Sequence, residues 1–151
     1  MMRYPIIILI FTLLYCECDN NEVEIWEICY SIENTIFLNN PNTSAREFPI
    51  SICELINLET LDLDVMFGDT NFLVGEIPAC IGNLENLTHL NLGWNTLEGE
   101  IPESLGNLQN LTYFSVLSNL LSGTIPESIG NLNNLTYLNL GFNYFDGNIP
   151  E

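Results

Sequence analysis

The sequence contains no lysine, and its only basic residues are Arg3 and Arg46, against 20 acidic residues. The formal net charge is therefore -18. Binding to nucleic acid or to an anionic membrane surface depends on attraction between protein cations and phosphate groups, and here that force would be repulsive. The composition argues against both classes of partner. It is compatible with a cationic partner or with a solvated acidic surface.

Histidine is also scarce, since His89 is the only one, and the five cysteines form no C-x-x-C pair. Metal centres in proteins usually combine several histidine and cysteine ligands at short spacing. We therefore expect no metal site and no cofactor.

Long hydrophobic runs are absent except for Ile6–Tyr15, which follows one positively charged residue. The run is shorter than the roughly 20 residues that span a bilayer, and it is typical of a secretory signal. We expect residues 1–18 to be a signal peptide cut after Cys18, and we expect no transmembrane helix. The alternative is a bacterial lipid anchor on Cys16, although the bulky Tyr15 precedes it where a small residue is usual.

The twelve residues IPESLGNLQNLT recur 24 positions later as IPESIGNLNNLT. Three consecutive copies occupy residues 77–100, 101–124 and 125–148, with a stub at 149–151, and a longer copy at 48–76 precedes them. The spacing L-x-x-L-x-L-x-x-N-x-L predicts a solenoid of short parallel strands joined by extended or 3-10 return segments. The apolar residues of one turn are buried only when turns stack. The extra residues around 65–69 predict a bulging loop.

One asparagine recurs just after each predicted strand, at Asn71, Asn95, Asn119 and Asn143. An amide at this position can bond to backbone groups of its own turn and of its neighbours. We expect this ladder to be structural.

The phrase L-x-G-x-I-P-x-x-[IL]-G-N-L-x-N-L resembles the plant-type leucine-rich repeat of receptor-kinase ectodomains and polygalacturonase-inhibiting proteins. The resemblance covers residues 48–151, and Trp26 and Cys29 are similar to part of the N-terminal cap of those proteins. It implies an α/β-type horseshoe with the strands on its concave face, and a cap with a degenerate first repeat over residues 19–47. It also implies a non-catalytic recognition scaffold at the cell surface or outside the cell.

Five cysteines in an exported chain indicate oxidation. If Cys18 is retained, a bridge to Cys29 would pin the cap, as the resemblance implies. Cys53 and Cys80 fall two positions apart in equivalent places of adjacent turns, which lie about 5 Å apart. A bridge between them and a pair of buried thiols are both compatible with this spacing.

Four asparagines begin N-x-[ST] triplets, the acceptor pattern for N-glycans. They are Asn42, Asn86, Asn110 and Asn134. The last three follow the repeat period, so they are either glycan sites or part of the repeat consensus.

Residues in each strand alternate between the core and the concave face, so the outward positions of successive turns form rows. The predicted rows are Thr60, His89, Tyr113 and Tyr137; Asp62, Asn91, Ser115 and Asn139; Asp64, Gly93, Leu117 and Gly141; and Val65, Trp94, Ser118 and Phe142. Aromatic rings supply contact area and amides supply directional bonds, so we expect these rows to bind a protein, a peptide or a cell-wall glycan. Solvated repeat positions without a ligand are the alternative.

Catalysis requires converging groups and exclusion of water. A triad of His89, Ser115 and Asp62 or Asp64 can be drawn, but it has no identifiable oxyanion hole on an open sheet. We expect no enzyme activity.

The sequence leaves three interpretations open: a recognition module, a structural or adhesive surface protein, and the N-terminal part of a longer receptor-like protein. No polar cap follows the last repeat, so we also expect end-to-end self-association through the uncapped turn.

Overall fold

The structure, a computed structural model, describes residues 18–39, 46–65 and 72–150. The apolar N-terminal run, Cys16, Asn42, Asn71 and the centre of the expected bulging loop lie outside these residues. The strands are β1 (Glu22–Ile25), β2 (Ile28–Ser31), β3 (Phe37–Asn39), β4 (Arg46–Glu47), β5 (Thr60–Asp62), β6 (Leu73–Glu76), β7 (His89–Asn91), β8 (Thr96–Glu98), β9 (Tyr113–Ser115), β10 (Ser122–Thr124), β11 (Tyr137–Asn139) and β12 (Tyr144–Asp146). The 3-10 helices are η1 (Ile50–Glu54), η2 (Ala79–Asn83), η3 (Glu103–Asn107) and η4 (Glu127–Asn131).

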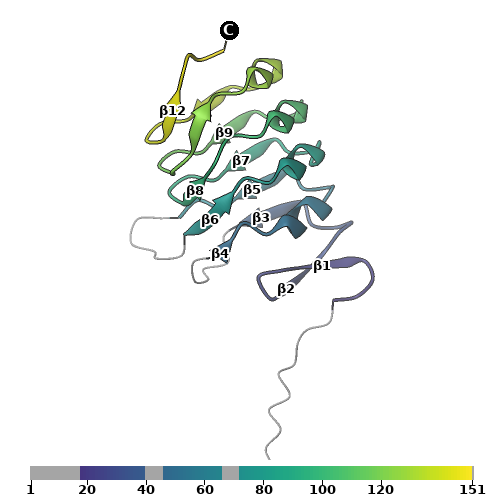
Figure 1. The fold of residues 1–151 in the computed structure, drawn as a ribbon. Coiled ribbons are helices and arrows are strands. Elements are labelled where there is room, and N and C mark those ends of the chain that lie inside the picture. Colours follow the sequence, from purple (N-terminus) through teal and green to yellow (C-terminus); the bar gives the residue numbers. More distant parts are fainter. Residues whose placement is uncertain (1–17, 40–45, 66–71, 151) are drawn as a thin grey trace, which may run out of the picture.

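The turns stack into a solenoid whose main sheet has one short strand from each turn (Figure 1). Its five parallel strands follow the order β11-β9-β7-β5-β3. The 3-10 helices lie on the side of each turn away from the strands (Figure 1). The predicted leucine-rich solenoid is confirmed, with 3-10 rather than α-helical return segments.

The return segments contain strands that the repeat pattern did not predict. Strands β4, β6 and β8 form a second parallel sheet, and β10 pairs with β12 in the same manner. Strands β6, β8, β10 and β12 precede Ile-Pro pairs, and β4 precedes Phe48-Pro49. The proline at the N-cap of each 3-10 helix ends the ladder because it has no N–H to donate. The turns are therefore linked along two sheets rather than one.

The core is one column of apolar side chains that runs through the stack. Leu61, Leu90 and Phe114, at equivalent positions of adjacent turns, are all 0% exposed. Each fully buried side chain of this size contributes about 1.5–3 kcal/mol, which explains why the repeats keep apolar residues at these places. In the last described turn the equivalent Leu138 is 39% exposed, because none of the described residues forms a turn above it.

The asparagine ladder is structural, as predicted. Asn119 is 5% exposed, and its amide donates to the carbonyl oxygens of Leu92 (2.9 Å) and Val116 (3.0 Å). Its Oδ1 atom accepts a bond from the backbone N–H of Leu97 (2.9 Å). One side chain thus joins its own strand to the main strand and to the second sheet of the preceding turn. Asn95 and Asn143 make the same set of bonds.

The N-terminal cap is the antiparallel hairpin of β1 and β2. The two residues between its strands, Trp26 and Glu27, have φ angles of 52° and 67°, the left-handed region typical of tight hairpin turns. Cys18 and Cys29 form a disulfide with a Cα–Cα distance of 5.5 Å. Cleavage after Cys18 would remove this bridge, so only a signal peptide that ends before Cys18 is compatible with it.

A second disulfide joins Cys53 on η1 to Cys80 on η2, with a Cα–Cα distance of 5.8 Å. The next turns show why these positions meet, since the equivalent residues Gly106 and Ser128 are so close that a Cβ on the glycine would lie 2.6 Å from the serine. The helices of adjacent turns touch at this point, and a cysteine pair there can be bridged. In the part of the chain that the structure describes, no helix is long and apolar enough to cross a membrane.

Candidate functional site

The first row of the main sheet is a stack of aromatic rings. The centroids of His89 and Tyr113 are 4.2 Å apart with an interplanar angle of 14°, and those of Tyr113 and Tyr137 are 4.3 Å apart with an angle of 4°. The strand register places these three residues directly beside one another. Because parallel strands lie about 4.8 Å apart, planar side chains at equal positions meet face to face. The stack is thus a direct result of the repeat register.

The same row continues to Phe37, which the sequence analysis missed. Phe37 on β3 is the register partner of Thr60, and 55% of it is exposed. The triplet Phe37-Leu38-Asn39 has the form aromatic-Leu-Asn that is also found at residues 137–139, which is the signal that could have identified it. Small Thr60 therefore stands between two aromatic residues in the row.

The second row differs from the prediction, because most of it is not available to a partner. Asn91 is 9% exposed and Ser115 is 4% exposed, so neither offers much contact area. Their side chains accept bonds from the backbone two residues ahead, at Gly93 (3.2 Å) and Leu117 (3.4 Å). Asn139 does the same in the last turn. Burial and this local bonding make Asn91 and Ser115 part of the scaffold, whereas Asp62 of the same row remains partly exposed.

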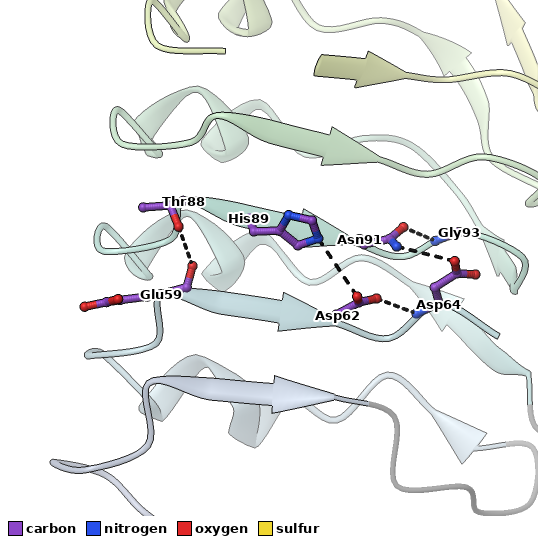
Figure 2. Close-up of polar contacts among 7 residues, drawn as sticks. All are labelled: Glu59, Asp62, Asp64, Thr88, His89, Asn91 and Gly93. Atoms are coloured by element: carbon purple, nitrogen blue, oxygen red, sulfur yellow. Dashed lines mark hydrogen bonds and ion pairs between the residues drawn. The ribbon is translucent and has the colours of Figure 1, made fainter. Parts of the chain in front are cut away.

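Carboxylates gather at one end of the face, on and after β5 (Figure 2). Asp62 Oδ2 lies 4.0 Å from His89 Nε2, and Asp62 Oδ1 accepts a bond from the backbone N–H of Asp64 (3.3 Å). Asp64 Oδ2 accepts a bond from Asn91 Nδ2 (3.4 Å), while its buried Oδ1 has no hydrogen-bond partner. Burial raises the pKa of the Asp64 carboxyl, and repulsion from Asp62 adds to this although the Asn91 bond opposes it.

The pKa of the Tyr113 phenol is also raised. Burial in the stack is the main cause that raises its pKa, and the neighbouring Tyr137 adds to it. Tyr113 is thus a neutral hydroxyl donor and acceptor at the pH of any extracellular fluid.

The triad that could be drawn from the sequence is not assembled. Ser115 Oγ is bound to the backbone N–H of Leu117, and no hydrogen bond joins it to His89 among the described residues. His89 instead stacks on Tyr113. This arrangement offers a surface for contact and no activated nucleophile.

Three of the four residues in the fourth row have a left-handed backbone. Trp94, Ser118 and Phe142 have φ angles of 53°, 57° and 54°. Such angles are uncommon for bulky residues, and Ser118 shows that the scaffold does not require an aromatic ring there. Phe142 is 83% exposed and Trp94 is 37% exposed, whereas Val65 at the start of this row is buried. The two aromatic residues therefore border the sheet as exposed side chains.

The periodic sequons serve the stack. The amides of Asn86, Asn110 and Asn134 donate to carbonyl oxygens of the preceding turn, at 3.0, 2.9 and 2.7 Å. Asn57, which begins no sequon, makes the same bond to Glu33 (3.0 Å). These asparagines are exposed, and a glycan on Nδ2 would leave one hydrogen for the bond, so glycosylation stays a prediction.

Metal ligation finds little support in the described residues. The one group that brings three ligand atoms together is Cys18, Glu22 and Cys29, and its two cysteines form a disulfide. Three surface hollows formed by described residues lie away from the aromatic row. Two of them lie along the turns, beside Pro78 and Glu100 and beside Asn107 and Asn131. The candidate site is therefore an open face rather than a pocket.

The repeats of this chain are similar to those of known proteins. A family model described as Leucine Rich Repeat matches residues 86–108, 110–132 and 134–151. No curated protein sequence matches the chain.

Several solved structures resemble it. One is the Arabidopsis receptor kinase HAESA in complex with the peptide hormone IDA and the co-receptor SERK1, with 40% identity over 76% of this chain and 18% of that chain, and a TM-score of 0.68. Another is the ectodomain of the receptor kinase GASSHO1/SCHENGEN3 from Arabidopsis thaliana in complex with CASPARIAN STRIP INTEGRITY FACTOR 2, with 39% identity, 77% and 13% coverage, and a TM-score of 0.65. The BIR3–SERK2 complex of Arabidopsis thaliana matches with 31% identity, 87% and 66% coverage, and a TM-score of 0.64. The chain thus spans less than a fifth of the two receptor-kinase ectodomains.

Proposed function

Because this chain belongs to the leucine-rich repeat proteins and is similar to plant receptor-kinase ectodomains, we propose that it is an extracellular, non-catalytic recognition module. Its ligand is a peptide, or an extended segment of a protein, that crosses the exposed face of the main sheet. The proposal places the protein outside the cell or at its surface. The similar HAESA structure contains a peptide hormone and a co-receptor, and the GASSHO1/SCHENGEN3 ectodomain is in complex with CASPARIAN STRIP INTEGRITY FACTOR 2.

The aromatic row is the observation that carries this proposal. Aromatic side chains that stay exposed on a regular, rigid surface supply large contact area at a small cost in conformational entropy. His89 and Tyr113 are half-buried and Tyr137 is 43% exposed, so part of each side chain is accessible to a partner, although the Tyr137 hydroxyl also accepts a bond from Asn139 (3.2 Å). A row of hydroxyl groups and ring edges can bond to the backbone of an extended chain.

The stacking also favours a peptide over a glycan. Sugar rings bind aromatic residues mainly through the ring face, and in this row the faces of Tyr113 are covered by His89 on one side and by Tyr137 on the other. Tyr113 therefore offers only its ring edge, and His89 and Tyr137 are each stacked on one face. A glycan would therefore find its best contacts at isolated rings such as Phe142, which lies outside the row.

A selection experiment tests the proposal. Random nonapeptides displayed on phage are selected on the immobilised chain and then counter-screened on the Tyr113→Ser/Tyr137→Ser variant. The matched control is Asn107→Ala/Asn131→Ala, which changes two exposed residues at the ends of 3-10 helices. Circular dichroism and thermal unfolding verify that both variants are folded.

We expect enriched peptides to bind the native chain and the control equally, and to lose about ten-fold or more in affinity for the tyrosine variant. A structural or adhesive role without a ligand on this face predicts no enrichment, or enrichment that is indifferent to the tyrosines. Either of these results would refute the proposal.

A further inference from the structure

The exposed face of the main sheet is electrically asymmetric. Asp62 and Asp64 stand on the turn of β5, and Glu59 precedes that strand, whereas β9 and β11 carry no charged residue. Tyr113 and Tyr137 thus lie in one half of this surface and the carboxylates in the other, where Phe37 on β3 also stands. A ligand that crosses the whole face meets two different environments.

Positive charge that could neutralise these carboxylates is scarce in the described residues. Arg46 lies on β4 of the second sheet, where it is 3.8 Å from Glu27. His89 is the remaining basic side chain, and its Nε2 atom is 4.0 Å from Asp62, which is too long for a hydrogen bond. The acidic half of the face therefore lacks a strong internal counter-charge.

The carboxylate oxygens of Asp62 and Asp64 also accept long hydrogen bonds from the chain. The bonds that Asp62 accepts from the backbone and that Asp64 accepts from Asn91 are 3.3 and 3.4 Å long, at the weak end of the usual range. Carboxylates bind cationic donors in shorter and stronger bonds of about 2.7–2.9 Å. A cationic donor on this surface would gain bonds that the chain itself does not supply (Figure 2).

We propose that the partner segment carries an arginine, or less favourably a lysine, which docks on Asp62 and Asp64, while its neutral or aromatic remainder lies along Tyr113 and Tyr137. This inference rests on the function proposed above. Arginine is favoured because its planar guanidinium can pair with a carboxylate through two bonds and can also stack on a ring. One face of the His89 ring is covered by Tyr113, and its neighbour on the other side is the small Thr60, beyond which Phe37 continues the row.

The length of the segment follows from the width of the sheet. Five strands at about 4.8 Å spacing span about 19 Å, and an extended chain advances about 3.3 Å per residue. The contact segment is therefore about six residues long. The basic residue should stand near one of its ends.

The nonapeptide selection supplies the test, with Asp62→Asn/Asp64→Asn as the variant. The matched control is Glu103→Gln/Glu127→Gln, which removes the same charge from exposed residues on η3 and η4. The most enriched peptides are synthesised in two forms, one with their basic residues and one with citrulline, which has the shape of arginine but no charge. Calorimetry measures all pairs at low and high salt.

We expect arginine and lysine to be enriched in the selected pool, and we expect the citrulline form to bind the native chain about ten-fold more weakly. The aspartate variant should bind the basic and citrulline forms about equally. The control variant should keep the preference for the basic form within about two-fold. Both variants lose the same net charge, so a general attraction to net charge would affect them equally.

Four other results would overturn the inference. A pool that depends on Tyr113 and Tyr137 but shows no excess of basic residues would refute the cationic partner and leave the recognition function intact. An equal effect of the two charge variants would assign the attraction to net charge. Binding of calcium alone that is lost in the aspartate variant would assign these carboxylates to a metal ion. A pool without any enrichment would refute the recognition function as well.

Discussion

Replacement of Asn119 by alanine tests whether the asparagine ladder holds the turns together. Asn119 is 5% exposed and bonds to three backbone groups on its own turn and on the preceding one. In the Asn119→Ala variant, the carbonyl oxygens of Leu92 and Val116 each lose one donor. Each such bond contributes about 1 kcal/mol net. The N–H of Leu97 loses its acceptor in a buried position, which costs about 1–3 kcal/mol more.

Neighbouring asparagines of the ladder reduce the loss of hydrogen bonds. The Leu92 carbonyl still receives a bond from Asn95 (3.1 Å), and the Val116 carbonyl still receives one from Asn143 (2.8 Å). Only one backbone group is therefore left without a partner. The expected decrease in the free energy of unfolding is about 3–5 kcal/mol, a large part of the 5–15 kcal/mol that is typical of a domain.

Equilibrium unfolding in urea measures this decrease as a shift of the midpoint at unchanged slope. The control is Asn107→Ala on η3, an exposed asparagine whose loss should change stability by less than about 0.5 kcal/mol. If Asn119→Ala and Asn107→Ala unfold at the same urea concentration, the ladder is a by-product of the repeat and does not hold the stack together.

Four further variants probe three other features. Burial raises the pKa of Asp64, so the folded chain binds the Asp64 proton more tightly than the unfolded chain does. Proton binding therefore stabilises the fold at low pH, and this stabilisation is lost as pH rises through the raised pKa. Asp64→Asn should therefore be more stable than the native chain at pH 7, by less than about 1 kcal/mol after screening, with no gain at acid pH in thermal unfolding. Gly106→Ala should destabilise by more than about 2 kcal/mol because its Cβ would lie 2.6 Å from the next turn, whereas Gly75→Ala, with φ of 85° and open space, should cost only about 1 kcal/mol; equal urea midpoints would contradict this. Phe142→Asn should keep or slightly raise the melting temperature, since asparagine tolerates the left-handed backbone, yet weaken binding of selected peptides; unchanged binding would remove Phe142 from the site.

The repeat period was sufficient to predict the strands of the main sheet from Thr60 onward, since the register places Thr60, His89, Tyr113 and Tyr137 beside one another as expected. The pattern did not predict the second sheet. Its strands arise where the return segments of adjacent turns come within hydrogen-bond distance, and the leucine spacing does not encode this. Phe37 was missed because the first turn departs from the repeat around its single matching triplet.

The candidate site was predicted less completely than the fold. His89, Tyr113 and Tyr137 stand where the alternation of the strand places them, and the structure adds that their rings stack. Asn91 and Ser115 were expected to face a partner but are largely excluded from solvent. Alternation gives the side of the sheet on which a residue lies, but not how far its larger neighbours cover it.

The sequence by itself determined the period, the apolar column and the asparagine ladder. Each of these depends on identical residues at identical places in turns that must stack to bury their leucines. Only the tertiary structure decided that Cys53 pairs with Cys80, that Asn91 serves the scaffold, and that the carboxylates of the β5 turn stand beside His89 without a strong counter-charge. These features depend on distances between side chains of different turns, and such distances are set by packing rather than by spacing along the chain.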